Sequence, residues 1–341
     1  MYKFTTTERN NDKATEYETK SMLYLFGFRK ESKNVEVFII DCFNDVTGAD
    51  KTVQTLWDIQ SKGVKNLNPK KIGIALITLF QNFLSDIEFK YYILFMPKLK
   101  EMYLNDEDKQ SFKIDNFKSQ YYKNIKQGLQ EEYLRRNGAI PHDKELDEFL
   151  NIVEFVIAEE KKMEYIKKIT SFQTTVALKE EFYDAIFNEI RNTQTALKIK
   201  NIDGYEIMSA EEVLRYDKVL WKKEIDALVI NRMLGMDLFN HKAIPISFMD
   251  EIVSFDYEER KDIIQDCQSD IAKVLFDKNG RIVFWKFFGS LLAYGDVLKT
   301  QSPYDIVSRM KADKIIVPKI MDEMSVIYLI SALKEGMINE D

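Results

Sequence analysis

Three residues, Asp45, Gln60 and Lys62, have the types and spacing of a metal-dependent chemical site. A carboxylate and an amide carbonyl supply the oxygen ligands that Mg²⁺ takes in proteins, with Mn²⁺ as an alternative ion. A bound metal lowers the pKa of a water molecule and stabilises charge on a phosphate group, and a nearby lysine can orient or deprotonate that water. The three residues therefore indicate phosphodiester hydrolysis. Because Gln60 brings oxygen without charge, metal affinity should be lower than with a carboxylate.

Strand geometry explains why these residues should meet. Side chains alternate across a strand, so Asp58, Gln60 and Lys62 share one face of the strand predicted at residues 54–61, and the apolar residues between them share the other. The apolar face packs inward, and the polar face forms a row at the sheet edge. Asp45 ends the preceding strand, where a hairpin pairing of the two strands would bring it beside Gln60. Asp58 is either a further ligand or a solvated or lysine-paired carboxylate.

The elements that position these residues follow from hydrophobic periodicity and turn chemistry. Asn68 predicts an N-cap, with Pro69 at the first helical position. The near-continuous apolar run at residues 89–96 predicts a strand buried on both faces, as in a parallel pair. The early chain has room for one further strand. The predicted order is helix 14–28, strand 35–43, turn 44–50, strand 54–61, helix 69–84 and strand 89–96.

Asp45 followed by Gln60-Ser61-Lys62, within this order of elements, resembles the PD-(D/E)xK, or restriction-endonuclease-like, nucleases. The resemblance covers residues 14–97 of the 341. The Gln-x-Lys form looks like the effector nucleases of bacterial anti-phage defence, which include the CBASS effector endonucleases and the nuclease subunit of Lamassu-type systems. The resemblance implies Mg²⁺-dependent cleavage of double-stranded DNA, triggered by oligomerisation on infection, and protein partners such as an SMC-like ATPase subunit.

The resemblance also implies further members of the site. In this family a Glu on the first helix often faces the metal, which indicates Glu18, with Glu16 as the alternative. Asp41 and Asp45 both end the first strand, so both stay candidates for the metal ligand. The implied metal ligands are thus Asp45, Gln60, Glu18 and Asp41, and the implied catalytic residues are Asp45, Gln60, Lys62 and Glu18.

Three lysines follow the motif at the start of the second helix, namely Lys65, Lys70 and Lys71. Lysines at such a position suit contacts to a DNA backbone. A basic, solvated turn explains them equally well. They are therefore candidates for nucleic-acid contacts.

The two parts of the chain differ in charge. Residues 1–130 carry a formal charge of +3 and residues 131–341 carry −10. An acidic, helix-rich region suits protein docking better than a DNA surface. The predicted fold class is an α/β restriction-endonuclease-like core, with a mixed sheet flanked by helices, at residues 1–125, and a mainly α domain for oligomerisation or partner docking at 126–341. Residues 281–295 are apolar and read as either a helix or a buried strand.

Composition excludes several other classes of protein. Two cysteines rule out a disulfide framework or a zinc cluster, and two histidines make His-based metal sites and Ser-His-Asp triads poor candidates. The N-terminal segment lacks the apolar core of a signal peptide, and no run is apolar enough to span a membrane. We therefore expect a cytoplasmic location and no membrane contact.

Two other functions compete with a DNA endonuclease. The first is a non-catalytic assembly or binding subunit that keeps a nuclease-like fold, and the second is a nuclease that acts on RNA. Both use the same residues, so the sequence alone leaves them open.

Overall fold

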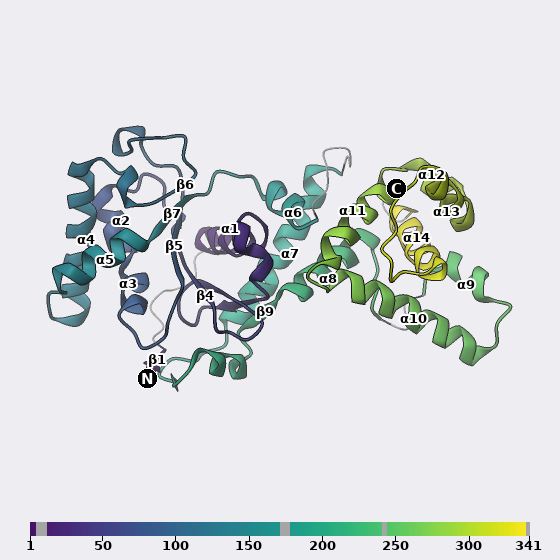
Figure 1. The fold of residues 1–341 in the computed structure, drawn as a ribbon, viewed down its shortest axis with the longest axis horizontal. Helices are drawn as coiled ribbons and strands as arrows, with labels where there is room; N and C mark the ends of the chain where they lie inside the picture. Colours follow the sequence, from purple (N-terminus) through teal and green to yellow (C-terminus); the bar gives the residue numbers. More distant parts are fainter. Residues whose placement is uncertain (5–11, 171–177, 241–243, 339–341) are drawn as a thin grey trace. The chain divides into compact units, whose positions relative to one another are not determined.

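A computed structural model describes residues 1–4, 12–170, 178–240 and 244–338 (Figure 1). The chain forms two compact units, Met1–Tyr165 with Asn188–Lys222 and Ile166–Phe187 with Lys223–Asp341. It crosses between them within α6 (Lys162–Thr170), within α7 (Glu180–Lys198) and at the start of α8 (Lys222–Leu234). Among the described residues, none of the helices is both long and apolar enough to cross a lipid bilayer.

The first unit is built on a seven-stranded mixed sheet in the order β6-β7-β5-β4-β3-β2-β9. Strand β4 is central, pairing antiparallel with β3 and parallel with β5. The pair β5–β7 is also parallel, and the other neighbours are antiparallel. The strands are β2 (Val37–Ile40), β3 (Val46–Ala49), β4 (Leu56–Ser61), β5 (Tyr91–Met96), β6 (Ser111–Phe112), β7 (Glu154–Ile157) and β9 (Val219–Trp221). A separate short pair joins β1 (Tyr2–Lys3) to β8 (Glu206–Ile207).

Helices cover both faces of this sheet (Figure 1). Helix α1 (Asp12–Gly27) lies on one face, where Met22, Leu25 and Phe26 are buried as its apolar periodicity predicts. The opposite face is covered by α2 (Pro69–Ala75), α3 (Ile77–Phe83), α4 (Ser119–Asn137) and α5 (Asp143–Ile152). Four 3₁₀ helices complete the unit, at Lys30–Asn34, Glu101–Tyr103, Ile114–Asn116 and Ala210–Tyr216.

Two glycines in α2 and α4 allow those helices to approach closely. A Cβ at Gly73 would lie 2.0 Å from the carbonyl oxygen of Ile125, and one at Gly128 would lie 2.2 Å from that of Lys70. Such distances exclude any larger residue unless the backbone shifts. The pair of glycines therefore sets how α4 lies against α2.

The start of the crossover helix is confirmed. The Asn68 side chain accepts a hydrogen bond from the backbone N–H of Lys71 at 2.9 Å, and Pro69 occupies the first helical turn. The helix predicted to run to residue 84 divides at Leu76 into α2 and α3. Strands β4 and β5 are parallel across this crossover, as the apolar run at 89–96 predicts.

The predicted hairpin between residues 35–43 and 54–61 is wrong. The segment predicted as a turn, 44–50, contains strand β3, which lies between β2 and β4 and pairs with both. The polar row on β4 is also not at a sheet edge, because β4 is the central strand. Asp58 and Gln60 on that face are buried, at 0% and 4% exposure. The additional strand that the early chain had room for is therefore β3.

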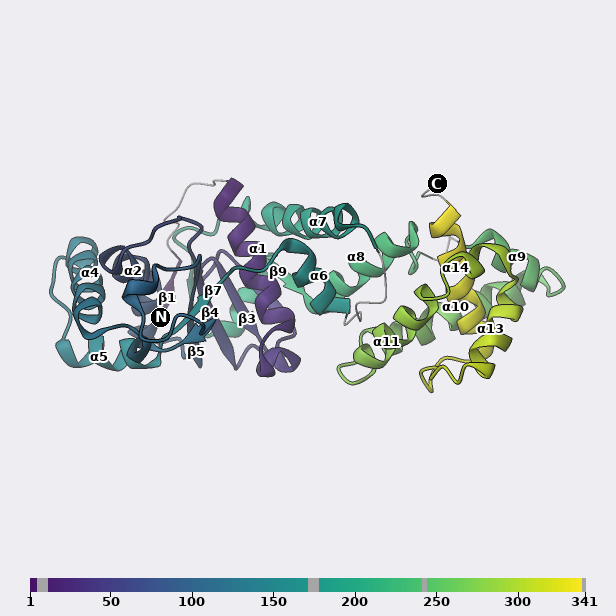
Figure 2. The same cartoon turned by 90° about the horizontal axis from the view of Figure 1, so that it is seen from above.

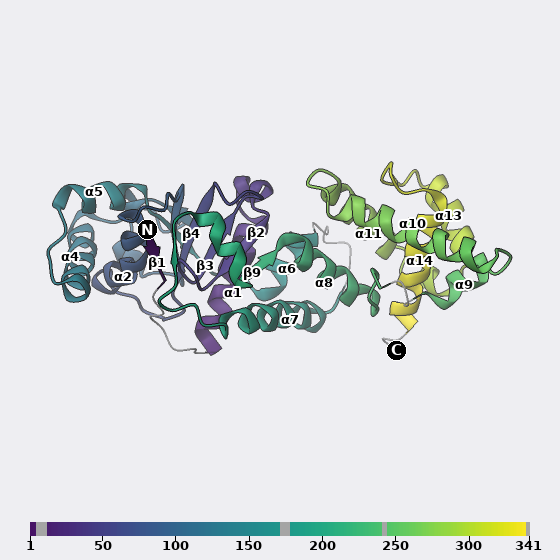
Figure 3. The ribbon, with the colours of Figure 1, turned by 90° about the horizontal axis from the view of Figure 1, so that it is seen from below.

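The second unit is helical, as predicted for the C-terminal part. Figure 3 shows its helices gathered around α14 (Glu323–Ile338), which packs against α9, α10, α12 and α13. The ambiguous segment 281–295 is a helix. The remaining helices are α8 (Lys222–Leu234), α9 (Ile246–Ile252), α10 (Tyr257–Leu275), α11 (Gly280–Leu292), α12 (Asp296–Thr300) and α13 (Pro303–Ala312).

The division into units differs from the predicted boundary between residues 125 and 126. Strands β7 and β9 lie beyond that boundary and still belong to the sheet of the first unit. Both strands fall inside the part of the chain predicted to be mainly α. Pairing with β5 and β2 accounts for their extended backbone.

Candidate functional site

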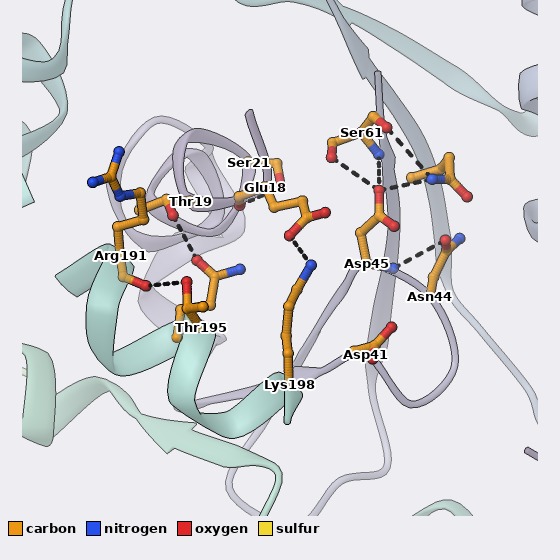
Figure 4. Close-up of polar contacts among 12 residues, drawn as sticks. Glu18, Thr19, Ser21, Asp41, Asn44, Asp45, Ser61, Arg191, Thr195 and Lys198 are labelled. Atoms are coloured by element: carbon orange, nitrogen blue, oxygen red, sulfur yellow. Dashed lines mark hydrogen bonds and ion pairs between the residues drawn. The ribbon is translucent and has the colours of Figure 1, made fainter. Parts of the chain in front are cut away.

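The Asp45 carboxylate is the centre of a hydrogen-bonded cluster at the end of β4 (Figure 4). Its Oδ2 atom accepts hydrogen bonds from Gln60 Nε2 at 2.7 Å, from the Ser61 backbone N–H at 2.7 Å and from Ser61 Oγ at 2.9 Å. Strand β3 begins at Val46, opposite Ile59, so Asp45 lies opposite Gln60. The hydrogen bond from the Ser61 backbone N–H to the Asp45 side chain therefore lies where the β3–β4 pairing ends.

Glu18 reaches the same cluster from α1. It is 5% exposed and forms an ion pair with Lys198 at the C-terminal end of α7. Figure 4 shows its carboxyl group pointing toward Asp45, and Figure 2 shows this end of α7 beside α1. A buried hydrogen bond from Thr19 Oγ1 to Gln194 Oε1, at 2.8 Å, fixes the same two helices together.

The electrostatics of Glu18 reflect these neighbours. Its pKa is raised to about 7, chiefly by burial and also by the negative charges of Asp45 and Asp41, while Lys198 opposes the rise. The implied alternative, Glu16, pairs instead with Lys20 and Lys162. Of the two glutamates, it is thus Glu18 that lies beside Asp45.

Asp41 has a different partner from Asp45. It occupies the turn between β2 and β3 with a left-handed backbone, φ 53°, and its backbone N–H donates to the Asp45 carbonyl oxygen at 3.2 Å. Its carboxylate forms an ion pair with Lys218 at 3.4 Å, and the Lys218 side chain is only 2% exposed. The structure therefore places Asp45 against Gln60 and Asp41 against Lys218.

Lys62 lies just past the end of β4 and is half-buried. Its backbone N–H donates to the carbonyl oxygen of Phe95 at 2.8 Å, which extends the parallel pairing with β5 by one bond. This bond fixes the position from which the Lys62 side chain leaves the strand.

Asp58 is not solvated, because it is fully buried, and within the part of the chain that the structure describes it forms no ion pair with a lysine. The Asn82 side chain on α3 donates to its Oδ2 at 2.7 Å. Burial raises the pKa of Asp58 and the hydrogen bond from Asn82 opposes the rise, with a net value of about 7. A carboxyl group with this pKa holds its proton over much of the range below neutral pH.

A cavity of about 220 Å³ lies next to Asp45 in the first unit. Its lining is mostly polar and brings together Asp41 and Asp45, the cations Lys3 and Arg136, and several side-chain amides. Among the described residues, Glu18 and Lys62 do not belong to the lining. The amides are those of Asn44, Gln60, Gln81 and Asn82, and the remaining lining residues are Tyr2, Phe4, Cys42, Phe43, Thr78 and Ile202.

The predicted DNA-contacting lysines lie elsewhere on the surface. Lys65, Lys70 and Lys71 are exposed and do not line the cavity. Lys70 forms an ion pair with Glu131 of α4 at 2.6 Å.

Sequence reasoning missed three residues of the site. Ser61 donates twice to Asp45, Lys198 neutralises Glu18, and Arg136 lines the cavity. Ser61 belongs to the Gln-Ser-Lys triplet, but its contact with Asp45 follows from the β3–β4 pairing, and the sequence pattern predicts a turn where β3 lies. Lys198 and Arg136 come from distant helices, and no local pattern marks them.

The donor groups around Asp45 match a hard divalent cation in type, since they are two carboxylates and an amide. Burial is the main cause of the raised pKa of Glu18, and the charge of Asp45 adds to it, so a cation between the two carboxylates would offset their repulsion. Two features oppose binding: Asp45 Oδ2 already accepts three hydrogen bonds, and Lys198 already neutralises Glu18. Within the described residues, no three His, Cys, Asp or Glu side chains form a group that could hold a metal ion.

The chain matches no protein-family model, no curated protein and no solved structure.

Proposed function

We propose that the chain is a Mg²⁺-dependent endonuclease that cleaves double-stranded DNA, as the effector subunit of a bacterial anti-phage defence complex. The observation that supports it best is the convergence of Asp45, Gln60 and Glu18 from three separate elements. The order of α1, three strands, a crossover helix and the parallel strand β5 agrees with the order that the resemblance requires, with β3 as its additional strand.

In this proposal Glu18, Asp45 and the Gln60 amide oxygen hold the metal ion, with Mn²⁺ as a substitute for Mg²⁺. The metal, when bound, supplies an activated water and stabilises charge on the scissile phosphate. Lys62 orients that water or offsets phosphate charge. Ser61 holds the Asp45 carboxylate in place through two hydrogen bonds, and Lys198 balances the charge of Glu18 when no metal is bound.

The helical second unit is proposed to dock on partner proteins, among them an SMC-like ATPase subunit, or on another copy of the chain. Its composition supports this proposal, since Ile166–Phe187 and Lys223–Asp341 together carry a formal charge of −5.

A specific observation favours the second candidate, a non-catalytic assembly subunit. The contacts that satisfy Asp45 and Glu18 within the protein are also those expected of carboxylates retained for structure. The two candidates differ in whether any phosphodiester is broken.

Incubation of supercoiled plasmid with Mg²⁺ and the protein, with its defence partners present, separates the two candidates. We expect nicked or linear DNA with wild type, little with Lys62→Ala, and wild-type cleavage with Lys123→Ala, an exposed lysine of α4. If the plasmid stays intact with both wild type and Lys62→Ala, the nuclease proposal fails and the assembly role is the candidate that is left. An RNA substrate in parallel tests the choice of DNA.

A further inference from the structure

The cavity beside Asp45 contains two cations that the proposed mechanism does not use. Lys3 of β1 and Arg136 of α4 line it together with Asp41 and Asp45. A space that presents both carboxylates and cations suits a ligand with more than one charged group better than a single ion.

Arg136 carries a positive charge that the protein does not fully neutralise. Glu132 of α4 accepts hydrogen bonds from Arg136 Nε at 2.9 Å and from Arg135 Nη2 at 2.6 Å, and Arg135 Nε donates to its other oxygen at 2.7 Å. The Glu132 carboxylate thus accepts hydrogen bonds from two guanidinium groups. These groups, with Arg135 first, hold the pKa of Glu132 near 2, so the three side chains carry a net charge of +1.

The two arginines differ in where they lie. Arg136 lines the cavity and its side chain is 24% exposed, whereas Arg135 lies outside the cavity and is 69% exposed. The bond to Glu132 uses Nε of Arg136, and its guanidinium carries further N–H donors in a planar fork. Such a fork matches the oxygens of a phosphate group, and the contact survives partial burial because the guanidinium is weakly hydrated.

We propose that Arg136, with Lys3, binds a phosphate group of the nucleic-acid substrate in the cavity beside Asp45. This assignment rests on the proposed function, because Asp45 and Gln60 line the same cavity. A polynucleotide carries a row of phosphates, so one group lies at the metal-binding carboxylates while a neighbouring group lies at Arg136. Lys70 is predicted from the sequence to contact a phosphate group, but it suits that role less well than Arg136 because it is exposed and already paired with Glu131.

The test measures binding without catalysis. Fluorescence anisotropy follows a labelled duplex of about 20 base pairs in EDTA, with the full chain as wild type, Arg136→Gln and Arg135→Gln. Both substitutions remove one positive charge from the same cluster, so the long-range field changes equally, and Arg135→Gln removes two hydrogen bonds to Glu132 where Arg136→Gln removes one. We expect Arg136→Gln to weaken binding about tenfold or more, as for a charged hydrogen bond, and Arg135→Gln to change it less than about twofold.

Two further measurements sharpen the result. The slope of log affinity against log salt should fall by about 1 in Arg136→Gln, the value for one lost phosphate contact. Arg136→Lys keeps the charge without the fork and should bind between wild type and Arg136→Gln. Thermal unfolding of each variant shows that the fold is intact.

The outcomes separate this inference from the proposed function. Equal losses in Arg136→Gln and Arg135→Gln, or no loss in either, overturn the role of Arg136 even if plasmid is cleaved. A selective loss in Arg136→Gln supports it even if no plasmid is ever cleaved, and the nuclease proposal then fails by itself. A wild type that binds no nucleic acid in EDTA at low salt also overturns it.

Discussion

Glu18 of α1 and Lys198 of α7 form an ion pair in which both side chains are more than nine-tenths buried. The carboxylate also faces Asp45 and Asp41, so Lys198 offsets the charge of Glu18 in acidic surroundings, while Lys218 pairs with Asp41. Removing one partner of a buried pair typically costs about 3–5 kcal/mol, because the other charge stays buried without compensation. The stability of the first unit should therefore depend on this contact.

Lys198→Met should destabilise the protein more at pH 8 than at pH 6. Without the ammonium, the pKa of Glu18 rises above its present value of about 7. At pH 6 the carboxyl group then takes up a proton and becomes neutral, whereas at pH 8 part of the cost of an unpaired charge remains. We expect an additional loss of about 1–3 kcal/mol at pH 8, measured by urea unfolding at both pH values.

Lys200→Met is the matched control for Lys198→Met. Lys200 pairs with Asp217 at 3.3 Å, and both side chains are substantially exposed, at 47% and 84%. Exposed pairs contribute little, so this variant should unfold like wild type at both pH values. An equal loss at pH 6 and pH 8 in Lys198→Met would contradict the electrostatic role of Lys198.

Asp58→Asn should raise stability strongly at pH 8 and by a smaller amount at pH 5. The pKa of Asp58 is 3.8 in a reference state and about 7 in the fold. Between these values the folded protein keeps a proton that the unfolded chain has released, so its stability falls as pH rises. Asparagine does not titrate and still offers an oxygen to Asn82. The variant should therefore not lose the roughly 2–4 kcal/mol of unfolding free energy that wild type loses as the pH rises to 8.

Guanidinium unfolding of wild type and Asp58→Asn across pH 5 to 8 checks this expectation, with Asp108→Asn as a control. Asp108 is exposed, so its replacement should leave the wild-type slope in place. Parallel curves for wild type and Asp58→Asn would show that Asp58 is charged in the fold at neutral pH.

Mg²⁺ should raise the unfolding temperature of wild type, and Asp45→Asn should abolish the rise. A ligand at about ten times its Kd stabilises a folded protein by about 1.4 kcal/mol. Differential scanning fluorimetry with Mg²⁺ and then EDTA measures the change and its reversal. Asp50→Asn should keep the response, since Asp50 accepts from Gln54 and Thr52 in the exposed β3–β4 turn. A wild type that does not respond to either Mg²⁺ or Mn²⁺ would contradict the metal site.

Gly128→Ala should destabilise the first unit by about 1–3 kcal/mol, the usual cost of overpacking. A Cβ at this position would lie 2.2 Å from the carbonyl oxygen of Lys70, so α4 must move away from α2. Asn124→Ala, at an exposed position on α4, should leave stability unchanged or slightly improved. Calorimetric unfolding compares the two, and equal stability would show that the helices can separate at no cost.

Local patterns were enough for some elements of the fold. Asn68 and Pro69 mark the start of α2 because capping depends only on neighbouring residues. Strand β3 was missed because Asp45 and Gly48 look like turn residues. Gly48 is there for another reason: a Cβ on it would lie 2.7 Å from Leu25 Cδ1 of α1.

Some residues of the candidate site could likewise be predicted from the sequence, and others could not. Asp45 and Gln60 could be paired from the sequence because adjacent strands bring them together. The choice between Glu16 and Glu18 needed the position of α1 on the sheet. Lys198 and Arg136 needed the packing of α7 and α4, which no spacing along the chain encodes.

The pairing of β9 with β2 has a consequence for the newborn chain. Residues 37–40 leave the ribosome early, but their outer neighbour at 219–221 is made only after some 180 further residues. At about 5–20 residues per second, that delay is on the order of 10–40 s. During it the outer edge of β2 stays open to other chains, and neither Lys198 nor Lys218 is there to neutralise Glu18 and Asp41. For this interval, a nascent chain therefore holds Glu18 and Asp41 without the two lysines that pair with them in the folded protein.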